Sequence, residues 1–234
     1  MCSHNSMTKK IEELASRYGR KTDLVDAARE VIESKYDISV FTWPRCPIIT
    51  NAEEIQLYHW GLIPFWIKSK EEADKIKLRT YNARADSLFE KPSYREPAKA
   101  RRCLIPSTGF FEWRHENGKK IPYFIYLKNE ELFSLAGIYD IWRNPETGED
   151  VYTYSMVTTQ ANPMMEYIHN AAKRMPAILS REDEEKWLDL ATSRKELETL
   201  LLPYNEKYME AYPVNNNFIR KSPDDPSILE RRVS

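Results

Sequence analysis

Two stretches near the start of the chain place apolar residues at helical spacing. The first series, at positions i, i+3, i+4 and i+7, consists of Ile11, Leu14, Ala15 and Tyr18. After a break at Gly19 the spacing returns, at Leu24, Ala27, Ala28, Val31 and Ile32. The pattern predicts a pair of helices over residues 7–34, packed on a sheet.

The middle of the chain changes to short β-branched and alternating runs. These runs predict strands, at residues 37–43, 46–50, 53–63, 101–114, 120–128, 131–142 and 151–159. Asn117-Gly118 lies between two of them and is a strong hairpin signal. The polar turn of residues 143–150 joins two others. Together the runs indicate an antiparallel meander.

The last third of the chain is more helical. Asn162 and Ser180 are the expected N-caps of two helices, with Pro163 at the first position of one of them. Residues 208–214 are expected to form a last strand, and residues 221–234 a loose tail. We find no repeat and no linker. The fold class expected is a single α+β domain over residues 1–234, an antiparallel, barrel-like sheet flanked by helices, with residues 1–36 supplying the N-terminal segment and helices.

Composition narrows the class of protein. The 234 residues are 41% hydrophobic and 12% aromatic, which is enough for a sizeable core. Three cysteines, with no C-x-x-C pair, disfavour a disulfide framework and a zinc site and favour a reducing cytoplasm. We find no signal peptide, no membrane span and no metalloprotease, hydrolase or Walker motif. We therefore expect a cytoplasmic protein without a metal or nucleotide cofactor.

Positive charge is concentrated in one part of the chain. Residues 75–120 hold 12 lysines and arginines against 5 acidic residues, whereas the whole chain carries a formal net charge of −1. A positive face on a near-neutral protein suits binding to a phosphate backbone. A solvated loop region is the alternative explanation.

The chain begins with Met1-Cys2. If an aminopeptidase removes Met1, Cys2 carries a free α-amine and a thiol on one residue, a pair that no internal cysteine can offer. The plain alternative is that Cys2 is incidental, because chain termini are often poorly ordered.

Four further stretches carry candidate chemistry. In residues 80–86, Asn82 offers two donors and one acceptor, and Arg84 would point to the same side of an extended segment. The alternative is a turn asparagine and a surface ion pair. In residues 109–114, alternation puts Phe110 and Glu112 on one face, where burial would raise the pKa of the Glu112 carboxyl toward neutrality. The alternative is a solvated Glu112 paired with Arg114.

The other two stretches carry a histidine and two tryptophans. His169 ends a predicted helix, with Lys173 and Arg174 close behind it and able to reach phosphate. A capping or half-buried histidine is the commoner case. In residues 59–66, two tryptophans with a proline between them would suit a stacking platform for bases. A core aromatic cluster is the commoner alternative, and we expect Trp60 in the core and Trp66 more exposed.

Taken in order, these motifs resemble the SOS-response-associated peptidase (SRAP) family. The series is M-C, W-G-L-I-P-x-W, N-A-R, R-C-L-I-P-x-x-G-F-F-E-W, V-T-T-x-A-N and I-H followed by R-M-P, over residues 2–179, with a weaker echo at residues 213–215. The resemblance implies a protein that senses abasic sites in single-stranded DNA and forms a thiazolidine crosslink through Cys2, and we expect it to be a monomer. It also implies catalytic roles for Cys2, Asn82, Glu112 and His169, and DNA contacts for Arg84, Thr158, Arg174 and Trp66.

The sequence departs from the family pattern at three places. Ser3-His4 stand where Gly-Arg is usual, and Asp86 stands where Glu is usual. Three extra residues lie between His169 and Arg174, which leaves the position of Arg174 open. One expected phosphate contact is therefore absent, or His4 supplies it when protonated.

Two other functions remain compatible with these residues. An N-terminal-nucleophile peptidase would also expose Cys2, with its thiol attacking a carbonyl and its α-amine as base. Such enzymes usually have two stacked sheets and a longer strand pattern. A plain single-strand DNA binder would bind intact and abasic strands equally, and Cys2→Ala would have no effect.

Overall fold

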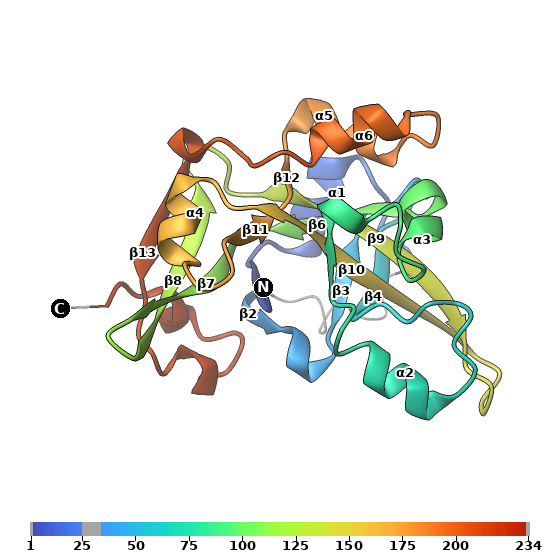
Figure 1. The fold of residues 1–234 in the computed structure, drawn as a ribbon, viewed down its shortest axis with the longest axis horizontal. Helices are drawn as coiled ribbons and strands as arrows, with labels where there is room; N and C mark the ends of the chain where they lie inside the picture. Colours follow the sequence, from blue (N-terminus) through green and yellow to red (C-terminus); the bar gives the residue numbers. More distant parts are fainter. Residues whose placement is uncertain (1, 25–33, 233–234) are drawn as a thin grey trace.

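The computed structural model describes residues 2–24 and 34–232, in which thirteen strands and six α-helices form one domain (Figure 1). The first sheet has five strands and the order β13-β8-β7-β1-β2. Its strands are β13 (Met209–Pro213), β8 (Lys119–Leu127), β7 (Gly109–Glu116), β1 (His4–Met7) and β2 (Lys35–Ser39). The short β1 is therefore an interior strand.

The second sheet has eight strands. Its main path is β12 (Ile178–Leu179), β9 (Phe133–Arg143), β10 (Asp150–Gln160), β4 (Gln56–Trp60) and β3 (Arg45–Ile48). Three more strands join it: β6 (Arg102–Ser107) on β9, and β5 (Asn82–Arg84) and β11 (Arg174–Pro176) on β10. Most pairs are antiparallel, but β4 and β5 run parallel to β10.

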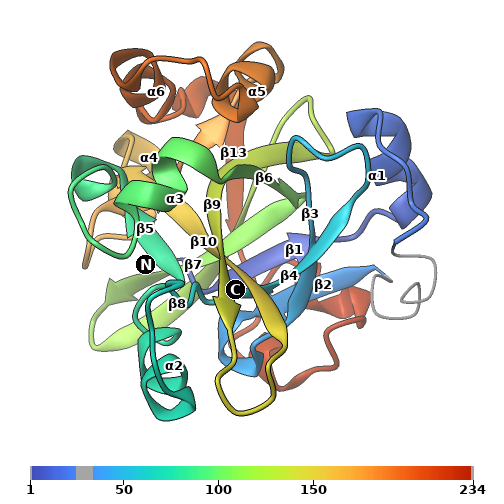
Figure 2. The ribbon, with the colours of Figure 1, turned by 90° about the vertical axis from the view of Figure 1, so that its right-hand side faces the viewer.

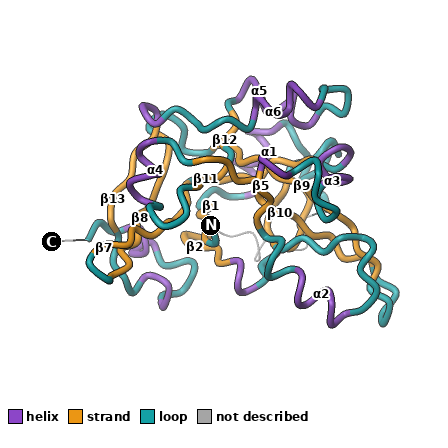
Figure 3. The backbone as a smooth tube through the Cα atoms, viewed as in Figure 1, coloured by secondary structure: helices purple, strands orange, loops and turns teal. Residues whose placement is uncertain are grey.

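The described helices are α1 (Ile11–Tyr18), α2 (Lys70–Ile76), α3 (Arg95–Ala100), α4 (Pro163–Ile168), α5 (Arg181–Leu188) and α6 (Arg194–Leu200). They lie outside the sheets: Figure 2 shows them around the strands, and Figure 3 shows α5 and α6 above the strands and α2 below them. Five 3₁₀ turns complete the described elements: η2 (Val40–Thr42), η3 (Ala85–Ser87), η4 (Glu206–Tyr208), η5 (Phe218–Arg220) and η6 (Pro226–Leu229).

The expected α+β class and single domain are confirmed, and the barrel-like sheet takes the form of two packed sheets. The chain changes sheet at Thr108, because β6 pairs with β9 whereas β7 pairs with β8 and β1. Among the described strands no ladder joins the two sheets into a closed barrel. N-terminal-nucleophile peptidases usually have two stacked sheets, so the two sheets of this fold do not exclude that function.

Alternation along β7 divides the apolar residues between two clusters, as the sequence predicts. Phe110 joins the main core between the sheets, and Phe111 joins a second cluster that includes Phe218 and Ile228, with Trp113 packed against it. Fully burying each such side chain contributes about 1.5–3 kcal/mol. The face of β7 that carries Glu112 is consequently the interior face.

The hairpin expected at Asn117-Gly118 is confirmed. Both residues have positive φ, 49° and 73°, as a two-residue type I′ turn requires. The register runs from Phe110 opposite Ile125 to Glu116 opposite Lys119. This turn fixes which residues of β7 face inward, because a slip of one residue would reverse every side chain.

The predictions for residues 162–169, 180–191 and 208–214 are also confirmed as α4, α5 and β13. The Asn162 side chain accepts a hydrogen bond from the Met165 amide, and Pro163 opens the helix. Ser180 is the N-cap of α5, although its hydroxyl bonds the Asp183 carboxylate.

Three predictions are wrong. The first predicted helix begins only at Ile11, as α1, because residues 4–7 form strand β1. The second predicted helix lies largely in residues 25–33, which are outside the described part of the chain. Residues 37–43 change after Ser39 from strand to the turn η2, ending at Trp43 with φ 51°. The tail expected to be loose packs on the first sheet as far as residue 232, since Ile228 is buried and the Pro223 carbonyl accepts from Tyr36.

Candidate active site

Strand β1 carries Cys2 into the middle of the molecule. His4 lies opposite Phe111 of β7 on one side and opposite Ser39 of β2 on the other. The Ser3 carbonyl accepts a hydrogen bond from the Val40 amide at 3.0 Å. Cys2 is only 1% exposed, and its Sγ lies 3.5 Å from the His4 carbonyl oxygen. Two ladders therefore hold the first residues of the chain inside the first sheet.

Asn82 approaches Cys2 from the second sheet. Its strand β5 pairs with β10, and its backbone carbonyl accepts a hydrogen bond from the Tyr94 hydroxyl at 3.2 Å. The side-chain Nδ2 donates to the Cys2 carbonyl at 2.7 Å. Among the described residues, Oδ1 of this buried amide has no hydrogen-bond partner. Since a buried acceptor without a donor is costly, Oδ1 is ready to accept from a ligand or from an amine.

Glu112 lies on the interior face of β7 and is 2% exposed. Burial raises the pKa of its carboxyl from 4.5 to about 7, because desolvation disfavours the charged form. The alternative pairing with Arg114 does not occur: Arg114 pairs with Glu116 and stacks over the Tyr167 ring. Glu112 is thus poised between its acid and base forms near neutrality.

His169 follows α4 directly and is buried beside Glu112. Its Nδ1 lies 2.8 Å from the Arg174 carbonyl oxygen and 3.5 Å from Oε1 of Glu112. A carbonyl can only accept, so Nδ1 carries the proton and Nε2 holds the lone pair of the neutral ring. Burial lowers the pKa of His169, which favours this neutral form.

Glu112 and His169 line a cavity of about 610 Å³ that we call the active-site cavity. Its lining includes Ser3, His4, Asp37, Glu112, Trp113 and His169. Cys2 lies behind this lining, and burial together with the Glu112 charge raises the pKa of its thiol. The thiol is therefore protonated at neutral pH, and deprotonation needs a nearby base.

The three extra residues after His169 form a tight turn. The Lys173 amide donates to the His169 carbonyl at 2.8 Å, and Lys173 itself adopts φ 50°. Asn170 exchanges two hydrogen bonds with the His115 backbone, at 3.0 and 2.8 Å. The insertion leaves Arg174 in reach of the other predicted residues and ties the His169 loop to the strand of Glu112.

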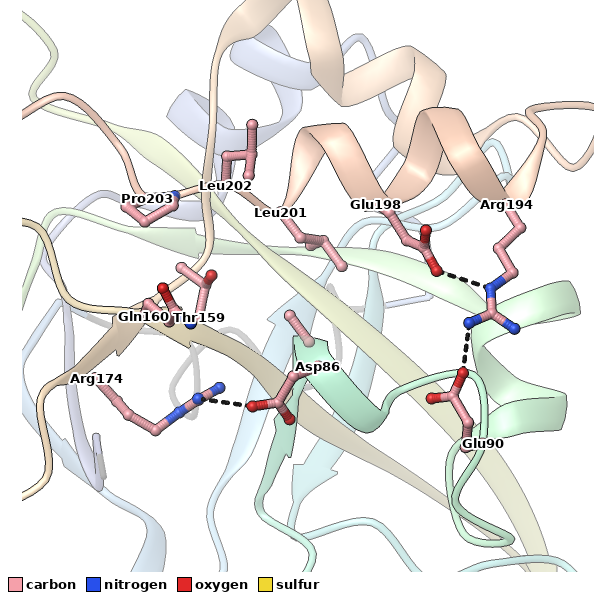
Figure 4. A pocket seen from close by; sticks show the side chains of 11 residues that line it. Asp86, Glu90, Thr159, Gln160, Arg174, Arg194, Glu198, Leu201, Leu202 and Pro203 are labelled. Atoms are coloured by element: carbon pink, nitrogen blue, oxygen red, sulfur yellow. Dashed lines mark hydrogen bonds and ion pairs between the residues drawn. The ribbon is translucent and has the colours of Figure 1, made fainter.

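Three predicted DNA contacts meet in one network beside the cavity. The Arg174 guanidinium donates to the Thr158 carbonyl at 2.5 Å and lies 3.4 Å from the Asp86 carboxylate. Arg84 forms a two-point pair with the same carboxylate, with Nη2 at 2.6 Å. Figure 4 shows Arg174 directed toward Asp86 across a cavity of about 280 Å³. We call this second space the Arg174 cavity.

The tryptophans behave as expected, but Trp66 lies apart. Trp60 is fully buried, whereas Trp66 is 43% exposed on the loop before α2, next to the exposed Phe65. Trp66 is not among the side chains that line the active-site cavity. The structure therefore brings Cys2, Asn82, Glu112 and His169 together, and Arg84, Thr158 and Arg174 beside them.

One buried pair was missed by the sequence analysis. His4 Nδ1 lies 2.7 Å from Oδ1 of Asp37, and the ring packs against Trp113 and Phe218. His4 is consequently fixed in the wall of the cavity rather than free on the surface. No sequence signal marks the pair, because the two residues are 33 positions apart.

The remaining charge and composition features add little to this site. The basic excess of residues 75–120 is dispersed: Arg102 is buried against backbone carbonyls, and Lys75 and Lys77 pair within and beside α2.

Among the described residues no three His, Cys, Asp or Glu side chains gather around a common point that could hold a metal ion. Over the described ranges, no helix combines the length and apolarity needed to cross a membrane.

Comparisons with known proteins give one consistent result. The model of the family described as SOS response associated peptidase (SRAP) matches residues 1–220. The chain is 42% identical over 173 residues to the abasic site processing protein YoqW of Bacillus subtilis, covering 73% of this chain and 74% of that protein. It is 31% identical over 201 residues to the abasic site processing protein YMR114C of Saccharomyces cerevisiae, covering 83% and 52%.

A solved structure shares the whole fold. A protein from Bacteroides thetaiotaomicron superimposes with a TM-score of 0.98 at 50% identity, covering 99% of this chain and all of the other. A second, from Bordetella bronchiseptica, gives a TM-score of 0.78 at 26% identity, covering 92% of this chain and all of that one.

Proposed function

Because this chain belongs to the SOS response-associated peptidase family, we propose that it processes abasic sites in single-stranded DNA by capturing them on Cys2. The observation that carries the proposal is the hydrogen bond from Asn82 to the Cys2 carbonyl, which holds the start of the chain beside Glu112 and His169. The names of the relatives, abasic site processing proteins, support the same substrate.

The proposed reaction requires removal of Met1 and joins the lesion to two atoms of Cys2. The α-amine has an ordinary pKa of about 8 and adds to the aldehyde of the opened sugar. Loss of water gives an imine. The thiol then adds to the imine carbon and its proton passes to nitrogen, which closes a thiazolidine ring. The product has the mass of protein plus DNA minus one water.

The buried residues supply the proton transfers of this sequence. Glu112, with its raised pKa, donates a proton to the departing hydroxyl and accepts one from the thiol. His169 accepts the sugar hydroxyl proton on Nε2 during ring opening, because its Nδ1 is held by the Arg174 carbonyl. Asn82 accepts from the α-amine on Oδ1 and positions it. Closure within one residue benefits from an effective molarity on the order of 10⁵ M or more.

DNA contacts complete the proposal. Arg84 and Arg174 lie beside the cavity and would bind phosphates next to the lesion, with Thr158 holding the Arg174 fork in place. Trp66, exposed on its loop, would stack on a base farther along the strand. One Cys2 per chain suffices, so we propose a monomer, and three free thiols suit the cytoplasm.

The competing function is a peptidase with Cys2 as nucleophile. It needs an easily formed thiolate, whereas burial raises the pKa of the Cys2 thiol. The deciding experiment is the intact mass of the protein before and after incubation with abasic single-stranded DNA, followed by denaturing electrophoresis. We expect a heat-stable adduct lacking one water, with no adduct from Cys2→Ala or from protein with an acetylated α-amine. A mass unchanged by the abasic strand would remove the proposal.

A further inference from the structure

A third cavity adjoins the active-site cavity, and Arg174 is not part of its lining. It has a volume of about 410 Å³ and lies between β2, β3 and the segment after η5; we call it the β2–β3 cavity. Four residues, Asp37, Ser39, Thr42 and Ile219, line both this cavity and the active-site cavity. The two spaces therefore meet along a common wall.

The charge of the β2–β3 cavity is positive. Lys35, Arg45 and Lys221 line it, and its one acidic lining residue, Asp37, is bound to His4. Lys221 Nζ donates to the Ser227 carbonyl at 3.1 Å and to the Ser227 hydroxyl, which leaves one of its three N–H donors for a ligand. The neighbouring Asp225 is itself bound to the Ser227 amide and hydroxyl.

The floor of the same cavity is apolar. Met7, Ile38 and Cys46 are buried beneath it, and Pro47 and Ile219 complete its walls. Basic side chains beside an apolar lining suit a single strand, because the charges can contact its phosphates while the apolar surface covers a base.

The three cavities lie in series. Arg174 lines the Arg174 cavity, and its carbonyl binds His169, which lines the active-site cavity. The active-site cavity is joined in turn to the β2–β3 cavity by their shared wall. A strand whose lesion occupies the active-site cavity must leave it on both sides. Arg84 and Arg174, which share the Asp86 carboxylate, can serve only one of them.

We propose that the β2–β3 cavity binds the nucleotides that flank the lesion on the side away from Arg84 and Arg174. Lys35, Arg45 and Lys221 contact their phosphates, and the apolar floor covers a base. This inference rests on the proposed function and adds the second half of the path of the strand.

The test is the double variant Lys35→Ala/Arg45→Ala, measured by fluorescence anisotropy with intact single-stranded DNA that spans all three cavities. Two lost phosphate contacts should lower the slope of log affinity against log salt by about 1.4 and weaken binding roughly ten-fold at about 0.1 M salt. The matched control is Lys128→Ala/Arg143→Ala, which removes two exposed positive charges that line none of the three cavities. An unchanged slope, or an equal change in the control, would overturn the inference.

A second measurement uses abasic oligonucleotides extended on one side of the lesion only. The double variant should slow the capture of one of the two and leave the other at the wild-type rate; equal effects on both would also overturn the inference. Failure of the wild-type protein to capture any abasic strand would instead reject the proposed function. As a control for folding, the midpoint temperature of thermal unfolding of both double variants should equal that of the wild type.

Discussion

The side-chain amide of Asn82 donates to the carbonyl of Cys2 at 2.7 Å, although the two residues are 80 positions apart. The bond joins the second sheet to the first residues of the chain, and it fixes the peptide group next to the proposed nucleophile. In the proposed mechanism Asn82 orients Cys2 through this bond, and its Oδ1 accepts a hydrogen bond from the α-amine.

Replacing Asn82 by alanine should therefore slow capture more than binding. Loss of one buried hydrogen bond, about 1–3 kcal/mol, predicts a rate of crosslinking roughly 10- to 100-fold lower under single-turnover conditions. The affinity for intact single-stranded DNA should stay within about two-fold of the wild type. An equal loss in rate and affinity would indicate a damaged surface rather than a misplaced Cys2.

The crosslinking rate should have a bell-shaped pH profile. The reactive state needs a neutral α-amine, with an ordinary pKa of about 8, and a protonated Glu112, with a pKa of about 7, since the acid form is needed to expel water. The rate should therefore rise up to about pH 7, change little between about pH 7 and about pH 8, and fall at higher pH. Glu112→Gln should lower the maximum and abolish the alkaline fall while DNA binding survives. A Gln variant with the wild-type profile would exclude Glu112 from the proton transfers.

Glu112 should also make stability depend on pH. Its pKa is raised from 4.5 to about 7 in the folded state, so between these values the unfolded carboxyl is ionised while the folded one keeps its proton. Stability is then lost as pH rises through this window, by on the order of 3 kcal/mol. Urea unfolding at about pH 5 and about pH 8 should show this loss for the wild type and not for Glu112→Gln. Parallel changes in both proteins would contradict the assignment.

His169 should matter only when a sugar ring has to be opened. His169→Ala is expected to slow capture of an abasic site about 10²-fold or more. An oligonucleotide that carries an acyclic aldehyde needs no ring opening and should react with the variant at the wild-type rate. Equal slowing with both substrates would assign His169 a different role.

Asn170 should act as a positioning residue through its two hydrogen bonds to His115. Asn170→Ala frees the inserted turn from β7, so the Glu112–His169 distance is less well fixed. We expect a crosslinking rate several-fold lower, which Asn170→Asp restores only in part because Asp keeps the acceptor and loses the donor. Asn144→Ala, in the distant turn between β9 and β10, serves as the control and should leave the rate unchanged.

Local patterns predicted the parts of the fold that depend on neighbours in sequence. Alternation at Phe110 and Phe111 and the Asn117-Gly118 turn define which face of β7 carries Glu112. The capping signal at Asn162 likewise defines the helix that ends at His169. The sequence therefore predicted Asn82, Glu112 and His169 together as candidate site residues.

Features that depend on pairing between residues far apart in the sequence could not be predicted from local patterns. Residues 4–7 have no strand pattern, and they become β1 only because β7 and β2 flank them. Residues 37–43 read as one strand, yet the chain turns after Ser39 to bring Thr42 to the two cavities. The His4–Asp37 pair arises from the same long-range pairing.

Placing the opening residues of the chain inside a sheet restricts how the protein can be handled. A purification tag or fluorescent fusion ahead of Cys2 would block the amine and would be joined to a buried residue. Recombinant material should carry such additions after residue 234 or release them by a protease that leaves cysteine first.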